Sequence, residues 1–457
     1  MKKFLRIFGA TLLCILFLFF ALWKNQVLPD VSTLTDMLRL WAGNIVDLGN
    51  VQQAGGGGGN RPTAPSDSDV IPDITLSGGV DSDLETAVCN GISQYHTEID
   101  LTPYNLHKDD ANDVLNMIRL SHPEFFYLGT INYLFNTATD MVTKLQISYL
   151  YEVADINTKR VEYEAALSQI VSGVPSDGSD FDKLLYLHDY FVREFCYDYT
   201  YTIRDAYTLF TQKTGVCQAY MLGLIAAANA VGIRSIPVTS NSMNHAWNLV
   251  ELDGAWYHVD ITWDDLDSLP THTSYTYFLQ SDVGLATTDS DLADPHRDWQ
   301  CSQTATDDKY DEVIWRDSST EMLRYDGSYY CTVPEAGGIS GAYNALYGGE
   351  DPTQMTRICD ISGVWRTANP AYRHTRCYAG LGAYNGKLIY NTQNALYIYD
   401  LETGATSVKL LSITATTSVY GIASVSATGV VTYIIDTKDI SGEPTYGYFD
   451  LVAADAA

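Results

Sequence analysis

Basic residues are scarce in this chain of 457 residues: 27 lysines and arginines stand against 56 aspartates and glutamates, a formal net charge of −29. No cluster of lysine and arginine follows residue 6. A polyanion would therefore be repelled, and nucleic-acid binding is not expected. Charged residues make up only 18% and apolar residues 46%, which excludes a chain that is disordered throughout. The acidic composition is typical of a soluble protein in a salty extracellular setting, with a cationic substrate or surface as the alternative.

Cysteine is also rare, since eight residues are too few for a disulfide scaffold in a chain of this length. Four of them lie in the C-terminal third, where the sequence allows one or two disulfides without choosing among the three pairings. These four are Cys301, Cys331, Cys359 and Cys377. No pair of cysteines has the CxxC spacing of a zinc site. Cys89 and Cys196 lie in apolar helical patterns, so we expect both to be small buried side chains.

The N-terminus carries an export signal. Three basic residues occur within the first six, and residues 7–23 then carry no charge. As a helix this run would be about 26 Å long, the short end of a membrane span and the long end of a signal-peptide core. The usual small-x-small cleavage site is missing, which favours an uncleaved anchor with its basic end inside the cell. We therefore expect the protein on the extracellular face of the membrane, or secreted if the signal is cleaved.

Composition and periodicity divide the chain into five segments. A signal anchor or signal peptide is followed by a flexible linker that contains five consecutive glycines, Gly55–Gly59. An α/β subdomain with helical periodicity comes next, then an α+β domain that carries the candidate chemistry, and finally a β-rich accessory domain. The expected segments are residues 1–24, 25–74, 75–177, 178–300 and 301–457.

The last segment has the pattern of an all-β domain. It contains 16 of the 33 tyrosines, and its short alternating runs are separated by Asp-Gly and Asn-Gly steps that favour tight hairpin turns. A weak repeat around Gly327, Gly386 and Gly429 resembles irregular propeller blades. Three such units are too few for a closed ring, so we predict a propeller-like repeat in an accessory domain.

A cysteine stands where an apolar helix should begin. The segment 214–220 reads TGVCQAY and precedes a strongly apolar helical run at residues 221–231. Cys217 would therefore open a helix, where unpaired backbone N–H groups and the positive end of the helix dipole favour a thiolate nucleophile. This feature alone leaves a buried structural cysteine equally open.

A predicted hairpin supplies partners for this thiol. Two apolar strands flank Asp253-Gly254, and a two-residue turn there would pair Trp247 with Asp260 and His245 with Thr262. Because side chains alternate between faces, His245 and Asp260 should lie on one face as diagonal neighbours. The carboxylate could then orient the imidazole while its second nitrogen takes the thiol proton. We expect His188 and His258 to be hydrogen-bonded structural residues.

These motifs together resemble the transglutaminase-like superfamily, specifically the bacterial cell-surface members related to the kyphoscoliosis peptidase. The resemblance rests on GVCQAY at 215–220, NHAWN at 244–248 and WYHVDITWD at 256–264, covers about residues 180–268, and extends weakly to SHPEFFY at 121–127. It implies a papain-like α+β fold for the catalytic domain and a Cys217, His245 and Asp260 triad. Family members usually have Asp-Pro-Thr where this chain has Asp260-Ile261-Thr262. The departure touches a strand end and no catalytic group.

The resemblance implies cysteine-dependent acyl transfer on peptide, protein or cell-wall peptide substrates. We expect a hydrolase, because water is abundant outside the cell. A protein-crosslinking transglutaminase and a non-catalytic binding protein for cell-wall or host polymers are the alternatives. Gln218, Tyr220 and Trp247 are candidates for the oxyanion site or the substrate groove. No cofactor or metal is expected, because the acidic residues at 264, 265 and 267 lack the glycine and terminal glutamate of a calcium loop.

Overall fold

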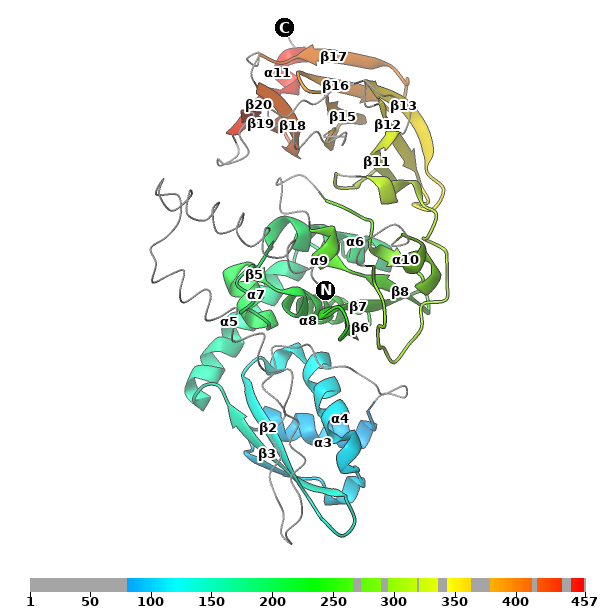
Figure 1. The fold of residues 1–457 in the computed structure, drawn as a ribbon. Helices are drawn as coiled ribbons and strands as arrows, with labels where there is room; N and C mark the ends of the chain where they lie inside the picture. Colours follow the sequence, from blue (N-terminus) through cyan, green and yellow to red (C-terminus); the bar gives the residue numbers. More distant parts are fainter. Residues whose placement is uncertain are drawn as a thin grey trace, which may run out of the picture. The chain divides into compact units, whose positions relative to one another are not determined.

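The computed structural model describes residues 80–265, 273–288, 295–318, 320–335, 343–362, 379–412, 417–437 and 445–455. Helices predominate in the first half of the described chain and strands in the second (Figure 1). The expected anchor and linker lie outside the described residues. Within the described part, no helix has both the length and the apolar character needed to span a membrane.

The N-terminal described region combines two helices with a small antiparallel sheet. Its elements are α3 (Ser82–Ser93), β1 (Glu98–Asp100), η1 (Thr102–Tyr104), α4 (Lys108–Ser121), η2 (Pro123–Phe125), β2 (Leu128–Phe135) and β3 (Val142–Tyr149). The strand order is β1-β3-β2. Both helices bury the apolar positions that the sequence spaces at helical intervals, among them Val88, Ile92 and Ile118. The helical periodicity expected for this segment is therefore confirmed.

The central region surrounds one apolar helix. Its helices are α5 (Val153–Val171), α6 (Asp180–Glu194), α7 (Ala206–Gln212), α8 (Cys217–Ala230), α9 (Ile261–Asp264) and α10 (Asp282–Thr288). Its strands are β4 (Cys196–Tyr197), β5 (Thr214–Gly215), β6 (Ser235–Ser240), β7 (His245–Leu252), β8 (Ala255–Val259) and β9 (Phe278–Gln280). The last four strands form an antiparallel sheet in that order, and β4 pairs with β5 in parallel. Helix α8 is apolar all round because it packs against β6, β7 and other helices.

Gly223 shows how tightly α8 is packed. A Cβ atom at this position would lie 2.8 Å from a Leu209 methyl carbon and 3.0 and 3.1 Å from ring carbons of Phe191 and Phe210. Glycine in a helix normally costs stability relative to alanine. Here the two rings leave no room for the extra methyl group, so crowding outweighs the better helix propensity.

We therefore expect Gly223→Ala to lower the free energy of unfolding by about 1–2 kcal/mol. Urea denaturation followed by tryptophan fluorescence would measure the change. Thr158→Ala on the exposed face of α5 is the control, expected within about 0.5 kcal/mol of the parent. A Gly223→Ala protein more stable than the parent would show that this helix face is loosely packed.

The C-terminal region consists of antiparallel sheets preceded by the short helix η3 (Ile314–Asp317). The first sheet contains β10 (Leu323–Tyr325), β11 (Ser328–Glu335), β12 (Tyr343–Gly349) and β13 (Thr356–Ser362). The second contains β14 (Leu381–Tyr384), β15 (Lys387–Asn391), β16 (Ala395–Asp400) and β17 (Thr406–Leu410). The third contains β18 (Thr417–Val425), β19 (Val430–Thr437) and β20 (Thr445–Asp450), and α11 (Leu451–Asp455) follows it.

Each sheet is a meander of sequential strands, as the weak repeat predicted. The turn residues Asp326-Gly327 and Asn385-Gly386 connect adjacent strands and have φ values of +50°, +78°, +47° and +73°. This left-handed backbone at both positions explains the Asp-Gly and Asn-Gly steps. The three sheets are separate in the described residues, and the propeller-like character of the repeat stays a prediction.

The structure excludes one of the two alternatives for the C-terminal disulfides and contradicts the burial expected for Cys196. Cys301 and Cys359 carry free thiols. A second disulfide within the C-terminal group would need both of them, so two bridges are not formed; Cys377 lies outside the described residues. Cys196 is exposed in β4, because its segment is a short strand and loop and not the helix that the apolar pattern suggested.

Candidate active site

Cys217 is the first residue of α8, as predicted. Val216 precedes the helix in an extended conformation, and no side chain caps the helix start. The Ala219 amide donates to the Val216 carbonyl at 2.9 Å and the Cys217 amide hydrogen-bonds with Tyr197. The positive end of the helix dipole still lies beside the thiol. Cys217 is 5% exposed, so this electrostatic effect acts in a largely dry environment.

The hairpin turn also forms as predicted, but its second strand is shorter. Asp253 and Gly254 make the two-residue turn, with φ values of +53° and +81°, and pairing runs from Leu252 with Ala255 to Asn248 with Val259. The expected pairing of His245 with Thr262 is wrong, because β8 ends at Val259 and residues 261–264 turn into α9. Asp260 caps that helix: its Oδ1 accepts a hydrogen bond from the Trp263 amide at 3.2 Å.

The capping role leaves the second carboxylate oxygen of Asp260 for the histidine. His245 Nε2 lies 2.5 Å from Asp260 Oδ2, and His245 also hydrogen-bonds with the Cys217 thiol. Since Nε2 is engaged by the carboxylate, Nδ1 is left for the sulfur. The structure thus brings together the three residues that the sequence selected, in the order thiol, imidazole and carboxylate.

Charge determines the protonation states of this chain of groups. Burial by itself lowers the pKa of His245, but the Asp260 carboxylate and the Cys217 thiol outweigh it and raise the pKa to about 10. Burial likewise works against ionised Asp260, yet His245 and His296 hold the pKa of this carboxyl well below its usual range. An imidazolium beside a carboxylate is therefore the stable state at neutral pH.

His296 is a site residue that the sequence did not reveal. Its Nε2 donates to Asp260 Oδ2 at 3.0 Å, so one carboxylate oxygen accepts hydrogen bonds from two histidines. His296 follows Pro295 in a segment without helical or strand periodicity and 36 residues beyond Asp260. No local pattern could have indicated this contact.

These three residues are also the group with metal-ligand geometry in the described part of the chain. Each of the three, His245, Asp260 and His296, offers one ligand atom, and these atoms lie within 4.8 Å of one another. All three residues are buried. Their hydrogen bonds already account for the arrangement, because both imidazoles donate to the same oxygen. A metal ion would have to displace both of these protons.

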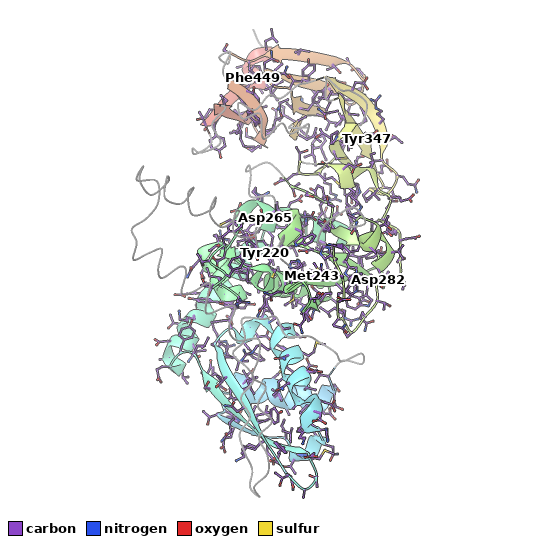
Figure 2. The ribbon with its side chains drawn as sticks, viewed as in Figure 1. Tyr220, Met243, Asp265, Asp282, Tyr347 and Phe449 are labelled. Carbon is purple, nitrogen blue, oxygen red and sulfur yellow. The ribbon has the colours of Figure 1, made fainter. Side chains whose placement is uncertain are left out.

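Two of the three candidate groove residues have other roles. Trp247 is buried beneath the site, with its ring stacked 5.4 Å from that of His245, and it donates from Nε1 to His258 Nδ1 at 3.0 Å. Tyr220 is buried and donates to Asp265 Oδ2 at 2.6 Å, and both residues are marked in Figure 2. Neither side chain lines an open groove, because both point inward from elements that pack on each other. Gln218 is half-buried in the first turn of α8.

The two histidines expected to be structural are indeed satisfied in the interior. His258 Nε2 lies 2.8 Å from Asp282 Oδ1, on the side of the ring away from Trp247. His188 lies between Asp189 at 3.0 Å and Asp264 at 3.2 Å. Burial lowers the pKa of His188, but the two carboxylates outweigh it and raise the pKa to about 9. Asp264 is therefore a partner of the buried His188 imidazole.

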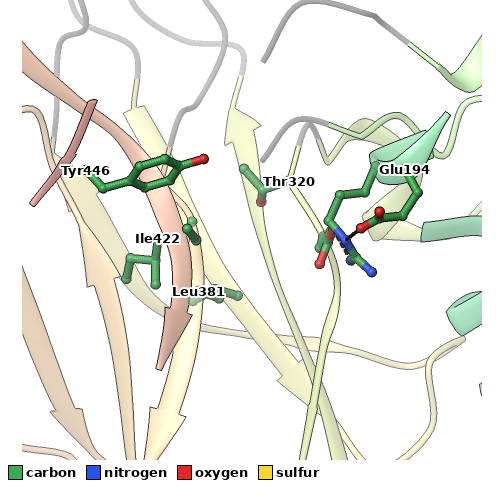
Figure 3. Close-up of a pocket in the computed structure, with 9 residues that line it drawn as sticks. Glu194, Thr320, Leu381, Ile422 and Tyr446 are labelled. Carbon is green, nitrogen blue, oxygen red and sulfur yellow. Dashed lines mark hydrogen bonds and ion pairs between the residues drawn. The ribbon is translucent and has the colours of Figure 1, made fainter. Parts of the chain in front are cut away.

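A cavity elsewhere in the structure contains none of the candidate triad. It has a volume of about 410 Å³ and lies between the end of α6 and strands of the C-terminal sheets (Figure 3). Its polar side comes from Arg193, which binds Glu321 at 2.8 Å and Glu194 at 3.2 Å. Because Arg193 is already paired with two carboxylates, its positive charge is not available to an anionic ligand.

Comparison with known proteins supports the motif resemblance. Residues 165–261 match the family model of the transglutaminase-like superfamily. The matched stretch begins in α5 and ends directly after Asp260, so it includes Cys217, His245 and Asp260. A search with the full chain finds no matching curated protein. The narrower resemblance to the kyphoscoliosis peptidase group stays a prediction.

Proposed function

We propose that this chain, which carries a transglutaminase-like superfamily domain at residues 165–261, is a cysteine-dependent hydrolase of peptide or amide bonds. The observation that carries the proposal is the hydrogen-bonded series of Cys217, His245 and Asp260 at the start of α8. A nucleophile, a base and a residue that orients the base are the three parts that covalent acyl transfer needs.

In the first half of the reaction, His245 holds the proton of Cys217, and the thiolate sulfur attacks the carbonyl carbon of the substrate. The carbon–nitrogen bond then breaks, the imidazolium gives its proton to the leaving amine, and a thioester remains on Cys217. Asp260 stabilises the imidazolium throughout. The Cys217 amide, as a helix-start N–H, is the candidate donor for the developing oxyanion, to which it would turn from its present acceptor, Tyr197.

In the second half, neutral His245 takes a proton from water, and the resulting hydroxide attacks the thioester. The carbon–sulfur bond breaks, the acid product leaves, and Cys217 regains its starting state. An amine in place of water would give cross-linking by the same steps. Water concentration favours hydrolysis wherever the site does not exclude water.

The experiment that tests this function offers both acceptors at once. The full-length protein is incubated with a mixed peptide library and a fluorescent primary amine, and mass spectrometry reads cleavage while fluorescence reads incorporation. We expect cleavage to dominate. Dominant incorporation would indicate the transglutaminase, and neither reaction, together with retained polymer binding, would indicate the non-catalytic binding protein.

We further propose an extracellular location with an N-terminal membrane anchor. The support is the charge-free stretch 7–23 behind three basic residues, together with the glycine-rich linker at 55–59. Cell fractionation followed by protease treatment of intact cells tests this location. We expect the full chain in the membrane fraction and its folded part accessible from outside; protection from external protease would contradict it.

The pKa of His245 predicts the pH dependence of turnover. Because the folded protein holds this pKa at about 10, the imidazolium that protonates the leaving amine persists throughout neutral pH. We expect kcat/KM to stay level from pH 7 to about 9 and to fall about tenfold per pH unit above about 10. The same imidazolium stabilises the fold below its unfolded pKa of about 6.5, and this contribution disappears as the pH rises through about 10.

Alkylation of Cys217 by iodoacetamide is the matched measurement, because it needs the thiolate but no general acid. Alkylation should therefore continue above pH 10 while peptide turnover falls. A decline in turnover already near pH 7 would contradict the stabilisation of the imidazolium by Asp260.

A further inference from the structure

One loop beside Cys217 exposes two large aromatic side chains. Tyr199 and Tyr201, in the loop that follows β4, are 71% and 60% exposed. Exposure of two neighbouring aromatic residues costs solvation free energy that a purely structural loop could avoid with polar residues. Their position next to the candidate nucleophile therefore calls for a functional explanation.

The loop is held rigidly, so the two rings are presented in a fixed place. Asp198 Oδ1 and Oδ2 accept five hydrogen bonds from the amides of Thr200, Thr202 and Ile203 and from the hydroxyls of the two threonines, at 2.5–3.2 Å. Despite the cost of removing this carboxylate from water, these donors hold the pKa of Asp198 well below its usual range. The carboxylate stays ionised and fixes the loop from inside.

The loop also contains a strained backbone conformation at Tyr201. Tyr201 has a φ of +59°, in the left-handed region that a bulky residue adopts at a cost. The loop accepts this conformation although glycine or asparagine would fit it better. Strain of this kind persists where the surrounding structure enforces it, and it is concentrated at functional sites.

The loop is joined directly to the strand that leads into Cys217. The amides of Cys196 and Asp198 donate to the carbonyls of Lys213 and Gly215 at 3.0 and 2.9 Å, and the Val216 amide donates to the Ile203 carbonyl at 2.9 Å. The Cys217 amide hydrogen-bonds with Tyr197, whose ring contacts those of Tyr199 and Tyr201 edge to face at 5.3 and 6.2 Å. The two exposed rings thus contact Tyr197, which in turn hydrogen-bonds with the backbone amide of the candidate nucleophile.

We propose that Tyr199 and Tyr201 form a substrate subsite that binds an aromatic side chain of the peptide near its scissile bond. The proposal rests on the proposed function. Both rings keep most of their surface exposed beside Tyr197, and aromatic rings pair favourably with a further aromatic group. A cationic side chain is disfavoured, because both carboxylates of the loop are engaged, Asp198 by its five donors and Asp205 as the cap of α7, while Arg204 places positive charge near Tyr197.

Peptidyl vinyl sulfones that differ in a single residue test this subsite. The thiolate of Cys217 adds to the vinyl carbon and a proton goes to the neighbouring carbon, so intact-mass spectrometry of the full-length protein gives the rate constant. We expect a probe with phenylalanine to react about 3–10-fold faster than the same probe with alanine. Tyr199→Ala and Tyr201→Ala should each reduce this ratio toward one and leave the rate with iodoacetamide unchanged.

Tyr448→Ala is the matched control, since Tyr448 is 69% exposed on β20, and it should keep the full ratio. Three results would overturn the subsite: an unchanged ratio in both loop variants, an equal loss of the iodoacetamide rate, or a preference for a lysine probe that the substitutions abolish. Failure of iodoacetamide to label Cys217 selectively in the parent protein would instead contradict the proposed function, and the subsite with it.

Discussion

Replacement of Cys217 by alanine should reduce peptide cleavage to the uncatalysed background, a loss of about 10⁴-fold or more. Without the sulfur there is no thioester, and neither His245 nor Asp260 can supply a nucleophile in its place. The helix start should survive, because alanine fits wherever the small cysteine side chain fits and no side chain caps α8. Cleavage of the peptide library and a thermal melt of the same sample measure both parts of this expectation.

Cys301→Ala is the matched control for this variant. Cys301 is also a free thiol, but burial raises its pKa to about 11, so it should be inert at neutral pH. We expect the control to keep its activity within about twofold. If Cys217→Ala cleaves peptides as fast as the parent protein, the covalent mechanism is wrong and Cys217 is a buried structural residue.

The candidate triad could be predicted from sequence because local rules place all three residues. Gly215 and Val216 before an apolar run put Cys217 at a helix start, and Asp253-Gly254 fixes the register of the β7–β8 hairpin. A tight turn determines which residues pair, and so which side chains share a face. The Asn-Gly and Asp-Gly turns of the C-terminal sheets were predictable for the same reason.

The remaining features depend on contacts between distant segments. The sequence alone extended the second strand through Trp263, because Ile261, Thr262 and Trp263 all favour strands. In the structure Asp260 caps a helical turn instead, and tertiary contacts override the propensity. His296 comes to Asp260 from a segment without regular structure, and the inward direction of Trp247 follows from its bond to His258.

Replacement of Asp260 by asparagine should have the second large effect on turnover, because Asp260 controls the tautomer and the charge of the His245 imidazole. We expect turnover to fall by about 10⁴-fold, because an amide can hold the ring in the wrong tautomer and cannot stabilise its positive charge. The pKa of His245, now held at about 10, should fall, so the alkaline decline in kcat/KM moves to lower pH. A change in this pH profile separates an electrostatic role from a loss of fold, which would lower the rate equally at every pH.

Asp282→Asn provides the comparison that decides how specific this effect is. Asp282, marked in Figure 2, pairs with the imidazole of His258 at 2.8 Å much as Asp260 pairs with that of His245 at 2.5 Å. Both substitutions remove a carboxylate from an aspartate–histidine pair, but Asp282 is half-buried and burial lowers the pKa of His258, whereas the pKa of His245 is raised. Only Asp260 is bonded to the histidine that contacts Cys217, so turnover in Asp282→Asn should stay within a few-fold of the parent. Equal losses in the two variants would mean that any buried aspartate–histidine pair supports activity through stability alone, and the assignment of Asp260 to the triad would then be wrong.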